Sequence, residues 1–377
     1  MSDITPARIL LESDKCIRCG NCLAVCPVTL TARMNKFPGP KHIGGDIARP
    51  THEFEVNDDN LFLCTACDAC RDVCPANISI DEIMRVIRSK IVESGRFSKT
   101  LKDALESTVK YGNPWGLPRS ERTKWAKGLP VKDLSKGEKA DVLLFIGCTN
   151  AYDTRAQEVT KSLVKILNKA KVDFGILGTD ESCCGEPVRW IGETGLFEEL
   201  KQRNTELIEK HGVSKIVTMS PHCYDAFNSY YDLKKTKIQH YTEFLYELVH
   251  TGRVKPAKKV NMRITYHDPC TLGRKHKVFD EPREILKSIP GVDLIEMERV
   301  RDEGFCCGGG AGRVWLETPV RERLSVARLH EASKTKPDVV ATSCPFCLIQ
   351  LEDAVKTIAD EHVKIKDIAE IFAESIE

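Results

Sequence analysis

The feature that most limits the fold of this chain is a run of cysteines that occurs twice near its start. Both runs have the spacing Cys-x2-Cys-x2-Cys-x3-Cys-Pro; they comprise Cys16, Cys19, Cys22 and Cys26 before Pro27, and Cys64, Cys67, Cys70 and Cys74 before Pro75. Three thiolates on one tight loop can bind three corners of a cubane iron–sulfur cluster, and the fourth ligand must then come from elsewhere. Zinc sites usually pair two CxxC or CxxH clips instead. The two runs therefore predict two [4Fe–4S] clusters.

The same spacing is found in bacterial-type ferredoxins. In those with two clusters, each run lends its last cysteine to the cluster of the other run. The resemblance implies that one cluster is bound by Cys16, Cys19, Cys22 and Cys74, and the other by Cys64, Cys67, Cys70 and Cys26. We expect residues 1–98 to form a helical, ferredoxin-like α+β module, and residues 99–139 to form a connector.

The composition excludes several function classes. The 377 residues include 56 basic and 55 acidic side chains, and this balance gives no global field for binding nucleic acid. No apolar stretch approaches the 18 residues of a membrane span. The 17 cysteines fall mainly in metal-ligand spacings without a secretory signal, so we expect reduced thiolates rather than disulfides. These features predict a cytoplasmic protein that can dock on the inner face of a membrane through a partner subunit.

The nine cysteines outside the two runs form a second, duplicated pattern. Its first copy has Cys148, Cys183-Cys184-Gly185 and Ser220-Pro221-His222-Cys223, and its second copy has Cys270, Cys306-Cys307-Gly308 and Cys344-Pro345-Phe346-Cys347. Corresponding positions are offset by 122 to 124 residues. Such a nearly constant offset indicates duplication of one structural unit.

Short apolar, β-branched segments in each copy predict parallel strands, and longer segments between them predict helices. We expect strands at 141–146, 172–177, 215–219, 263–266, 292–297 and 338–342, and helices at 78–107, 153–170, 195–211 and 317–333. The predicted architecture is two Rossmann-like α/β domains, at 140–255 and 256–377. Because ligands bind at the carboxyl ends of strands in such sheets, each copy should gather its cysteines in one loop-built pocket.

The order of these motifs resembles that in the catalytic iron–sulfur subunit of the membrane-associated heterodisulfide reductases of methanogens, and in the wider family around it. Gly112-Asn113-Pro114-Trp115-Gly116 in the connector also resembles that branch. The resemblance implies an anaerobic iron–sulfur oxidoreductase of methanogenesis, in which a complete CCG repeat binds a noncubane [4Fe–4S] cluster through five cysteines. In this chain the complete set consists of Cys270, Cys306, Cys307, Cys344 and Cys347.

The first repeat departs from the family pattern at Ser220, which stands where a cysteine belongs. Its remaining thiolates are Cys148, Cys183, Cys184 and Cys223. Four thiolates can hold an ordinary cubane or a zinc ion, so both a further iron–sulfur cluster and zinc stay open for this repeat. We therefore predict that the second repeat is the reactive one.

The family resemblance implies reduction of a disulfide, most simply the mixed disulfide of coenzyme M and coenzyme B, to two thiols. Electrons would come from a membrane cytochrome b-type subunit, or from another redox subunit such as a flavoprotein, through the two cubanes. The alternative is a non-catalytic subunit of a flavin-dependent glycolate, lactate or glycerol-3-phosphate dehydrogenase that passes electrons toward a quinone-type carrier. The chain has no flavin or nicotinamide fingerprint, so both interpretations require a partner.

Two histidines and two arginines near the cysteines are further candidates. His222 and His267 can either donate protons to departing thiolates or form hydrogen bonds behind the ligands. Arg189 and Arg313 occupy equivalent places after the two Cys-Cys-Gly motifs, where they can pair with an anionic substrate or form salt bridges.

Overall fold

Two parallel β-sheets form the core of the larger part of the molecule. The computed structural model describes residues 12–32, 36–47, 59–358 and 362–376. The strands of the first sheet lie in the order β1-β3-β2-β4-β5; they are β1 (Lys132–Asp133), β2 (Val142–Phe145), β3 (Phe174–Ile176), β4 (Lys215–Thr218) and β5 (Lys237–His240). All of its strand pairs are parallel. The central strands β2 and β4 are apolar and almost wholly buried, as expected where helices cover both faces.

The second sheet repeats this arrangement. Its order is β7-β6-β8-β9, again all parallel, with β6 (Met262–Tyr266), β7 (Val292–Leu294), β8 (Val339–Thr342) and β9 (Lys364–Asp367). The order matches β3-β2-β4-β5 of the first sheet strand for strand. The predicted pair of duplicated α/β units is therefore confirmed, with β1 of the connector as an additional edge strand in the first.

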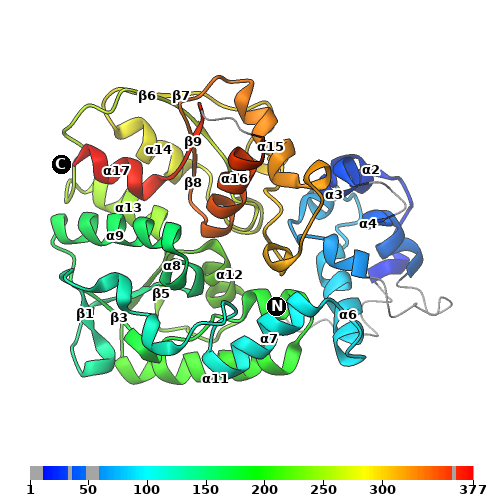
Figure 1. Ribbon diagram of the computed structural model, residues 1–377, viewed down its shortest axis with the longest axis horizontal. Helices are drawn as coiled ribbons and strands as arrows, with labels where there is room; N and C mark the ends of the chain where they lie inside the picture. Colours follow the sequence, from blue (N-terminus) through cyan, green and yellow to red (C-terminus); the bar gives the residue numbers. More distant parts are fainter. Residues whose placement is uncertain (1–11, 33–35, 48–58, 359–361, 377) are drawn as a thin grey trace.

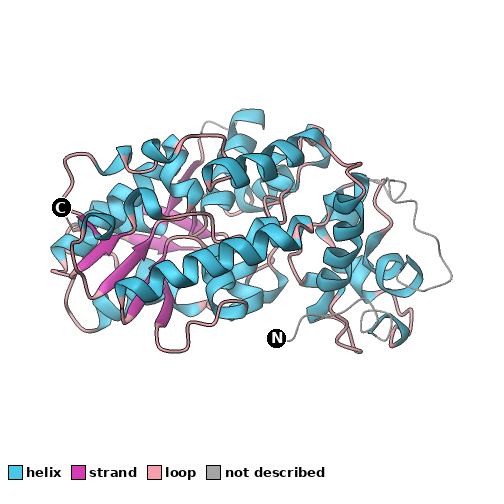
Figure 2. Cartoon of the chain, turned by 90° about the horizontal axis from the view of Figure 1, so that it is seen from below, coloured by secondary structure: helices cyan, strands magenta, loops and turns pink. Residues whose placement is uncertain are grey.

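Helices cross over between the strands of both sheets (Figures 1 and 2). In the first repeat they are α8 (Cys148–Tyr152), α9 (Thr154–Lys169), α10 (Glu186–Ile191), α11 (Thr194–His211), α12 (Pro221–Ser229) and α13 (Tyr241–His250). In the second they are α14 (Asp280–Ser288), α15 (Leu324–Ser333), α16 (Pro345–Ile358) and α17 (Ile368–Ser375). Several begin at a side-chain cap; for example, Asp153 accepts a hydrogen bond from the Ala156 N–H at 2.9 Å at the start of α9.

The described N-terminal part is helical and lies at one end of the long axis (Figure 1). Its helices are α2 (Asn21–Val25), α3 (Pro27–Thr31), α4 (Gly39–His42), α5 (Ala69–Asp72), α6 (Ile80–Glu93) and α7 (Lys99–Tyr111). Short 3-10 or π turns complete the chain; they are η1 (Ile43–Ile47), η2 (Asp59–Leu63), η3 (Arg119–Glu121), η4 (Lys124–Ala126), η5 (Leu134–Lys136), η6 (Gly178–Asp180), η7 (Thr271–Lys275), η8 (Arg301–Glu303), η9 (Arg313–Trp315) and η10 (Val320–Glu322).

Two predicted helices differ from the observed elements. The stretch 78–107 is divided into α6 and α7, because the chain turns between them at Gly95, which has a φ of +69°. The helix predicted at 317–333 begins only at Leu324, since Pro319 precedes the separate turn η10. No helix in the described part of the chain is long and apolar enough to cross a membrane.

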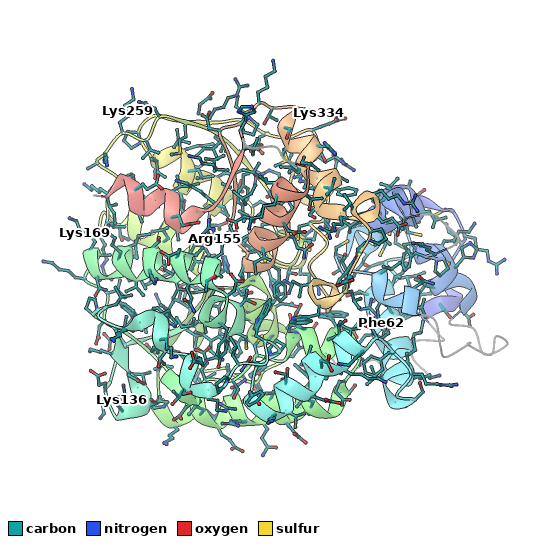
Figure 3. All side chains as sticks on the ribbon, viewed as in Figure 1. Phe62, Lys136, Arg155, Lys169, Lys259 and Lys334 are labelled. Atoms are coloured by element: carbon teal, nitrogen blue, oxygen red, sulfur yellow. The ribbon has the colours of Figure 1, made fainter. Side chains whose placement is uncertain are left out.

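The two repeats pack against each other through α9 and α17, which lie side by side (Figure 1). Arg155 of α9, labelled in Figure 3, is the main polar contact between them. Its guanidinium bonds both carboxylate oxygens of Glu370 at 2.8 Å, pairs with Glu352 and donates to the Ile365 carbonyl at 3.1 Å. One side chain thus fixes the first repeat to α16, β9 and α17 of the second.

Candidate functional site

The eight cysteines of the N-terminal runs line two neighbouring pockets. Cys16, Cys19, Cys22 and Cys74 line one pocket, which we call the outer site, and Cys26, Cys64, Cys67 and Cys70 line the other, the inner site. Each pocket therefore takes three thiols from one run and the last thiol of the other run. The same four-residue groups are the ligand sets that the ferredoxin spacing predicts; cluster binding by them stays a prediction.

The thiols of both sites repel one another as anions, which favours a cationic centre between them. Burial, followed by the charges of Cys16, Cys74 and Cys19, raises the pKa of Cys22. Burial and the neighbouring Cys67 raise the pKa of Cys26 to about 12. An iron–sulfur core bound by thiolates would remove this penalty, because it supplies positive charge where the sulfurs converge. All seventeen cysteines are free thiols, so none of them is used in a disulfide.

The five cysteines of the second repeat come together at the carboxyl ends of β6 and β8. The Sγ atoms of Cys270 and Cys306 lie 3.9 Å apart, and those of Cys307 and Cys347 lie 3.2 Å apart. The Gly308 N–H donates to Cys306 Sγ at 3.3 Å. Gly308 has a φ of +93°, a conformation that residues with a side chain rarely adopt. The loop thus turns a backbone donor toward the sulfur, as iron–sulfur sites require.

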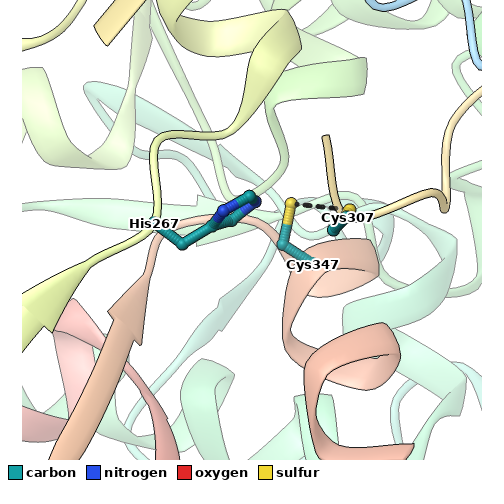
Figure 4. A group of neighbouring side chains, drawn as sticks. All are labelled: His267, Cys307 and Cys347. Carbon is teal, nitrogen blue, oxygen red and sulfur yellow. Dashed lines mark hydrogen bonds between the residues drawn. The ribbon is translucent and has the colours of Figure 1, made fainter. Parts of the chain in front are cut away.

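His267 lies beside these thiols (Figure 4). Its ring and the sulfurs of Cys307 and Cys347 offer ligand atoms within 4.8 Å of one another. Burial and the positive charge of Arg328 lower the pKa of His267 to about 3, and Arg328 Nε donates to His267 Nδ1 at 3.2 Å. This bond leaves Nε2 to carry the proton of a neutral ring. His267 can therefore give the sulfurs an N–H hydrogen bond without being an imidazolium.

His222 belongs to the first repeat but reaches the second site. Its Nδ1 lies 2.8 Å from Glu186 Oε1, its ring packs 4.7 Å from that of Phe346, and it hydrogen-bonds the sulfur of Cys344. Burial alone would raise the pKa of Cys344, but hydrogen bonds from Cys347 and His222 lower it to about 5. The pair His222–Glu186 therefore favours a thiolate at Cys344.

The four cysteines of the first repeat form a continuous chain of thiol contacts. Cys148 contacts Cys183, Cys183 contacts Cys184, and Cys184 contacts Cys223. Tyr231 Oη donates to the Cys184 carbonyl and Asn204 Nδ2 to the Cys183 carbonyl, both at 2.9 Å. These bonds hold the Cys-Cys-Gly loop in place from α11 and the segment after α12.

A buried ion pair adjoins this first-repeat site. Arg122 pairs with Glu181, and its guanidinium lies 3.9 Å from Cys148 Sγ. Glu181 also accepts backbone hydrogen bonds from Ile146 at 3.1 Å and from Gly147 at 2.8 Å. The carboxylate thus fixes the turn that leads from β2 to Cys148.

Ser220 serves a different purpose from its counterpart Cys344. Its Oγ accepts a hydrogen bond from the His222 N–H at 3.2 Å and so caps the start of α12. A hydroxyl used in this way is a local structural group, and the first repeat is left with four thiols.

The equivalent arginines after the Cys-Cys-Gly motifs form internal contacts with the N-terminal part. Arg189 Nη2 pairs with Glu82 of α6 at 2.8 Å, and its side chain is buried rather than on the surface. Arg313 Nη1 donates to the Leu63 carbonyl at 3.1 Å. Both side chains therefore bind the two repeats to the N-terminal part.

Sequence reasoning missed three of these residues. Glu181, Glu186 and Arg122 carry no motif of their own, although both acids lie within two residues of the Cys183-Cys184-Gly185 motif. An acid beside a thiolate pair is the signal that could have marked them. Their partners, Arg122 and His222, come from elsewhere in the chain, so spacing does not reveal them.

Family profiles and relatives agree with this arrangement. A 4Fe-4S dicluster domain matches residues 12–78, and a cysteine-rich domain (CCG) matches twice, at 142–228 and 264–352. The chain is 40% identical to a probable iron-sulfur-binding oxidoreductase, FadF, of Bacillus subtilis over 85% of its own length. It is 33% identical to an EtfAB:quinone oxidoreductase of Syntrophomonas wolfei over 98% of its length.

The coverage of the relatives differs. The chain spans about half of these two proteins, 47% and 59% of their lengths. It is 31% identical to HdrD, a constituent of the dihydromethanophenazine:CoB–CoM heterodisulfide reductase of Methanosarcina barkeri, over 97% of this chain and 95% of that protein. With one dicluster domain, two cysteine-rich domains and a relative matched nearly end to end, the chain belongs to the HdrD-like, heterodisulfide reductase family of iron–sulfur oxidoreductases.

Proposed function

We propose that this protein reduces a disulfide to two thiols at the cysteines of its second repeat. The overall reaction consumes two electrons and two protons for each disulfide, and mixed coenzyme M–coenzyme B disulfide is the simplest substrate. The observation that carries the proposal is the direct contact between the inner site and the second-repeat site, where the Cys67 and Cys306 thiols hydrogen-bond. Such a contact lets electrons that arrive at the N-terminal clusters reach the reacting sulfurs.

The proposed ligands are the five second-repeat cysteines, which would hold a noncubane [4Fe–4S] cluster, while the inner and outer sites would each hold a cubane. When bound, such a cluster supplies electrons one at a time together with a Lewis-acidic iron. The residues around it can handle protons and charge. His267 offers a neutral N–H toward Cys307 and Cys347, and the pair His222–Glu186 stabilises negative charge at Cys344.

A cavity beside the second-repeat site is the proposed place for substrate. Its volume is about 330 Å³, and its lining includes Gly308, Trp115 and Trp315. Both tryptophans also pack against the thiols of Cys307, Cys344 and Cys347. Their indole N–H groups are buried without a hydrogen-bond partner among the described residues. They are therefore available to donate to an acceptor on a bound molecule.

A second candidate function is electron transfer without disulfide chemistry. The similarity to FadF and to the EtfAB:quinone oxidoreductase favours it, because both relatives extend well beyond this chain. In this alternative a flavoprotein would deliver electrons and a quinone-type carrier would receive them. The first-repeat site, with its four thiols, would hold a further iron–sulfur cluster or zinc under either function. A membrane cytochrome b-type subunit is the partner proposed for the reductase.

Replacement of one cysteine in each repeat tests the proposal. Cys307→Ala should abolish dye-linked reduction of the disulfide and also the paramagnetic state that added thiol produces in the oxidised, anaerobically purified protein. The matched variant is Cys184→Ala, at the equivalent position of the first repeat, and it should keep the thiol-dependent signal. Both variants should retain the signals of the N-terminal clusters. A wild-type protein that carries iron in the second repeat but shows no thiol-dependent state would support the electron-transfer function instead.

A further inference from the structure

The two N-terminal runs place the same motif position in opposite environments. The residue after the first cysteine is Ile17 in the outer run and Thr65 in the inner run, and each is followed by a residue with left-handed backbone, Arg18 or Ala66. Ile17 is 69% exposed, whereas Thr65 is 3% exposed. The duplicated motif therefore has one loop that faces solvent and one that faces the interior.

The buried loop is pressed against the second-repeat site. The Thr65 Oγ1 and Cys306 Sγ atoms lie 3.5 Å apart. The Thr65 carbonyl packs so closely on Gly310 that a Cβ added there would lie 2.6 Å from the oxygen. Only a glycine at that position allows the two loops to approach this far, because a methyl group would have to overlap the carbonyl.

Two buried arginines of the second repeat clamp the same loop. Arg274 Nη1 donates to the Cys67 carbonyl at 3.2 Å, and Arg313 Nη1 donates to the Leu63 carbonyl at 3.1 Å. The contact between Thr65 and Cys306 is thus held from both sides. It is a fixed junction between the inner site and the second repeat rather than an incidental approach.

We infer that Thr65 is a positioning residue of the second-repeat site, whose hydroxyl donates a hydrogen bond to the Cys306 sulfur when that sulfur is a metal-bound thiolate. A hydrogen bond to a ligand sulfur stabilises the more negative, reduced state and so raises the reduction potential of the centre. The inference rests on the proposed function, since it requires clusters in both sites. It also assigns an order: the inner site exchanges single electrons with the second repeat, becoming oxidised as the latter is reduced, and the outer site replaces each electron.

The test compares Thr65→Val, which removes the hydroxyl at nearly equal volume, with Thr65→Ser, which keeps it. Ile17→Thr in the outer run is the matched control. The readout is the midpoint potential of the second-repeat centre in an electron paramagnetic resonance titration of the full-length, iron-loaded protein. Thr65→Val should shift this potential to a lower value, whereas Thr65→Ser and Ile17→Thr should leave it unchanged. The Gly308 N–H stays in place on the same sulfur in all three variants.

An unshifted second-repeat potential in Thr65→Val, with all clusters present, would overturn the inference and leave the proposed function intact. A second-repeat pocket without iron in the wild type would instead refute the proposed function. A measurement on the wild type covers the case in which Thr65→Val fails to assemble. When both centres are paramagnetic, the inner cubane and the second-repeat centre should show magnetic interaction that is stronger than that of the outer cubane. A stronger interaction with the outer cubane would also overturn the assigned order.

Discussion

Loss of Arg122 is expected to destabilise the first repeat strongly, because it would leave a buried carboxylate without its counter-charge. The side chains of Arg122 and Glu181 are 3% and 2% exposed. Removing one partner of such a pair typically costs ~3–5 kcal/mol, since the remaining charge has neither water nor a partner. Arg122→Met should therefore raise the local opening of the β2–α8 turn by ~100-fold or more.

Hydrogen exchange followed by mass spectrometry can measure this effect where it acts. The amides of Ile146 and Gly147 donate to Glu181, so a peptide that covers them should exchange faster in Arg122→Met by that factor. The double variant Arg122→Met/Glu181→Gln removes both charges and should recover about 2 kcal/mol of the loss. A peptide from β8, in the second repeat, is the internal control. Exchange that is unchanged in Arg122→Met, or a double variant that is no better than the single one, would refute the reasoning.

Two further predictions concern the second and first repeats. Burial raises the pKa of Asp367 to about 7, well above its value in an unfolded chain, so its contribution to stability is complete below pH ~4 and is lost as the pH rises through 7, at a cost of about 4 kcal/mol. Asp367→Asn keeps a side-chain cap for the Ala369 N–H, and its melting temperature should gain on the wild type between pH 4 and pH 8; a difference that does not change with pH would contradict the assignment. Ser220→Cys should supply a fifth thiol at the position equivalent to Cys344 while costing ~1 kcal/mol through the weaker cap on α12. Iron content and paramagnetic resonance of the first repeat should then approach those of the second, and spectra identical to the wild type would show that the fifth thiol is not the limiting ligand.

The local pattern of the chain was sufficient to predict the repeated units. Strands β2, β4 and β8 fall within the predicted segments, because a short run of buried β-branched residues between polar turns has few alternatives to a parallel strand. The cysteine offset likewise predicted two copies of one fold, and both sheets have the same strand order. The errors lie where a local pattern is weak: the start of α15 was placed seven residues too early, at 317 rather than Leu324.

The partners of the cysteines could not be predicted in the same way. Thr65 and Ile17 share one motif position, yet only the packing of the second repeat on the inner run makes one of them buried. His222 lies in the first repeat by sequence and serves Cys344 in the second. Arg122 and Glu181 are 59 residues apart and meet beside Cys148.

The sequence alone thus determined which residues can bind metal and which segments become strands, because ligand spacing and hydrophobic periodicity are set by near neighbours along the chain. The tertiary structure decided which loop faces solvent, which thiols share a site, and which charges and hydroxyls stand behind them. Those outcomes depend on contacts between residues dozens or hundreds of positions apart, and burial changes the pKa and hydrogen bonding of a side chain only after such contacts have formed.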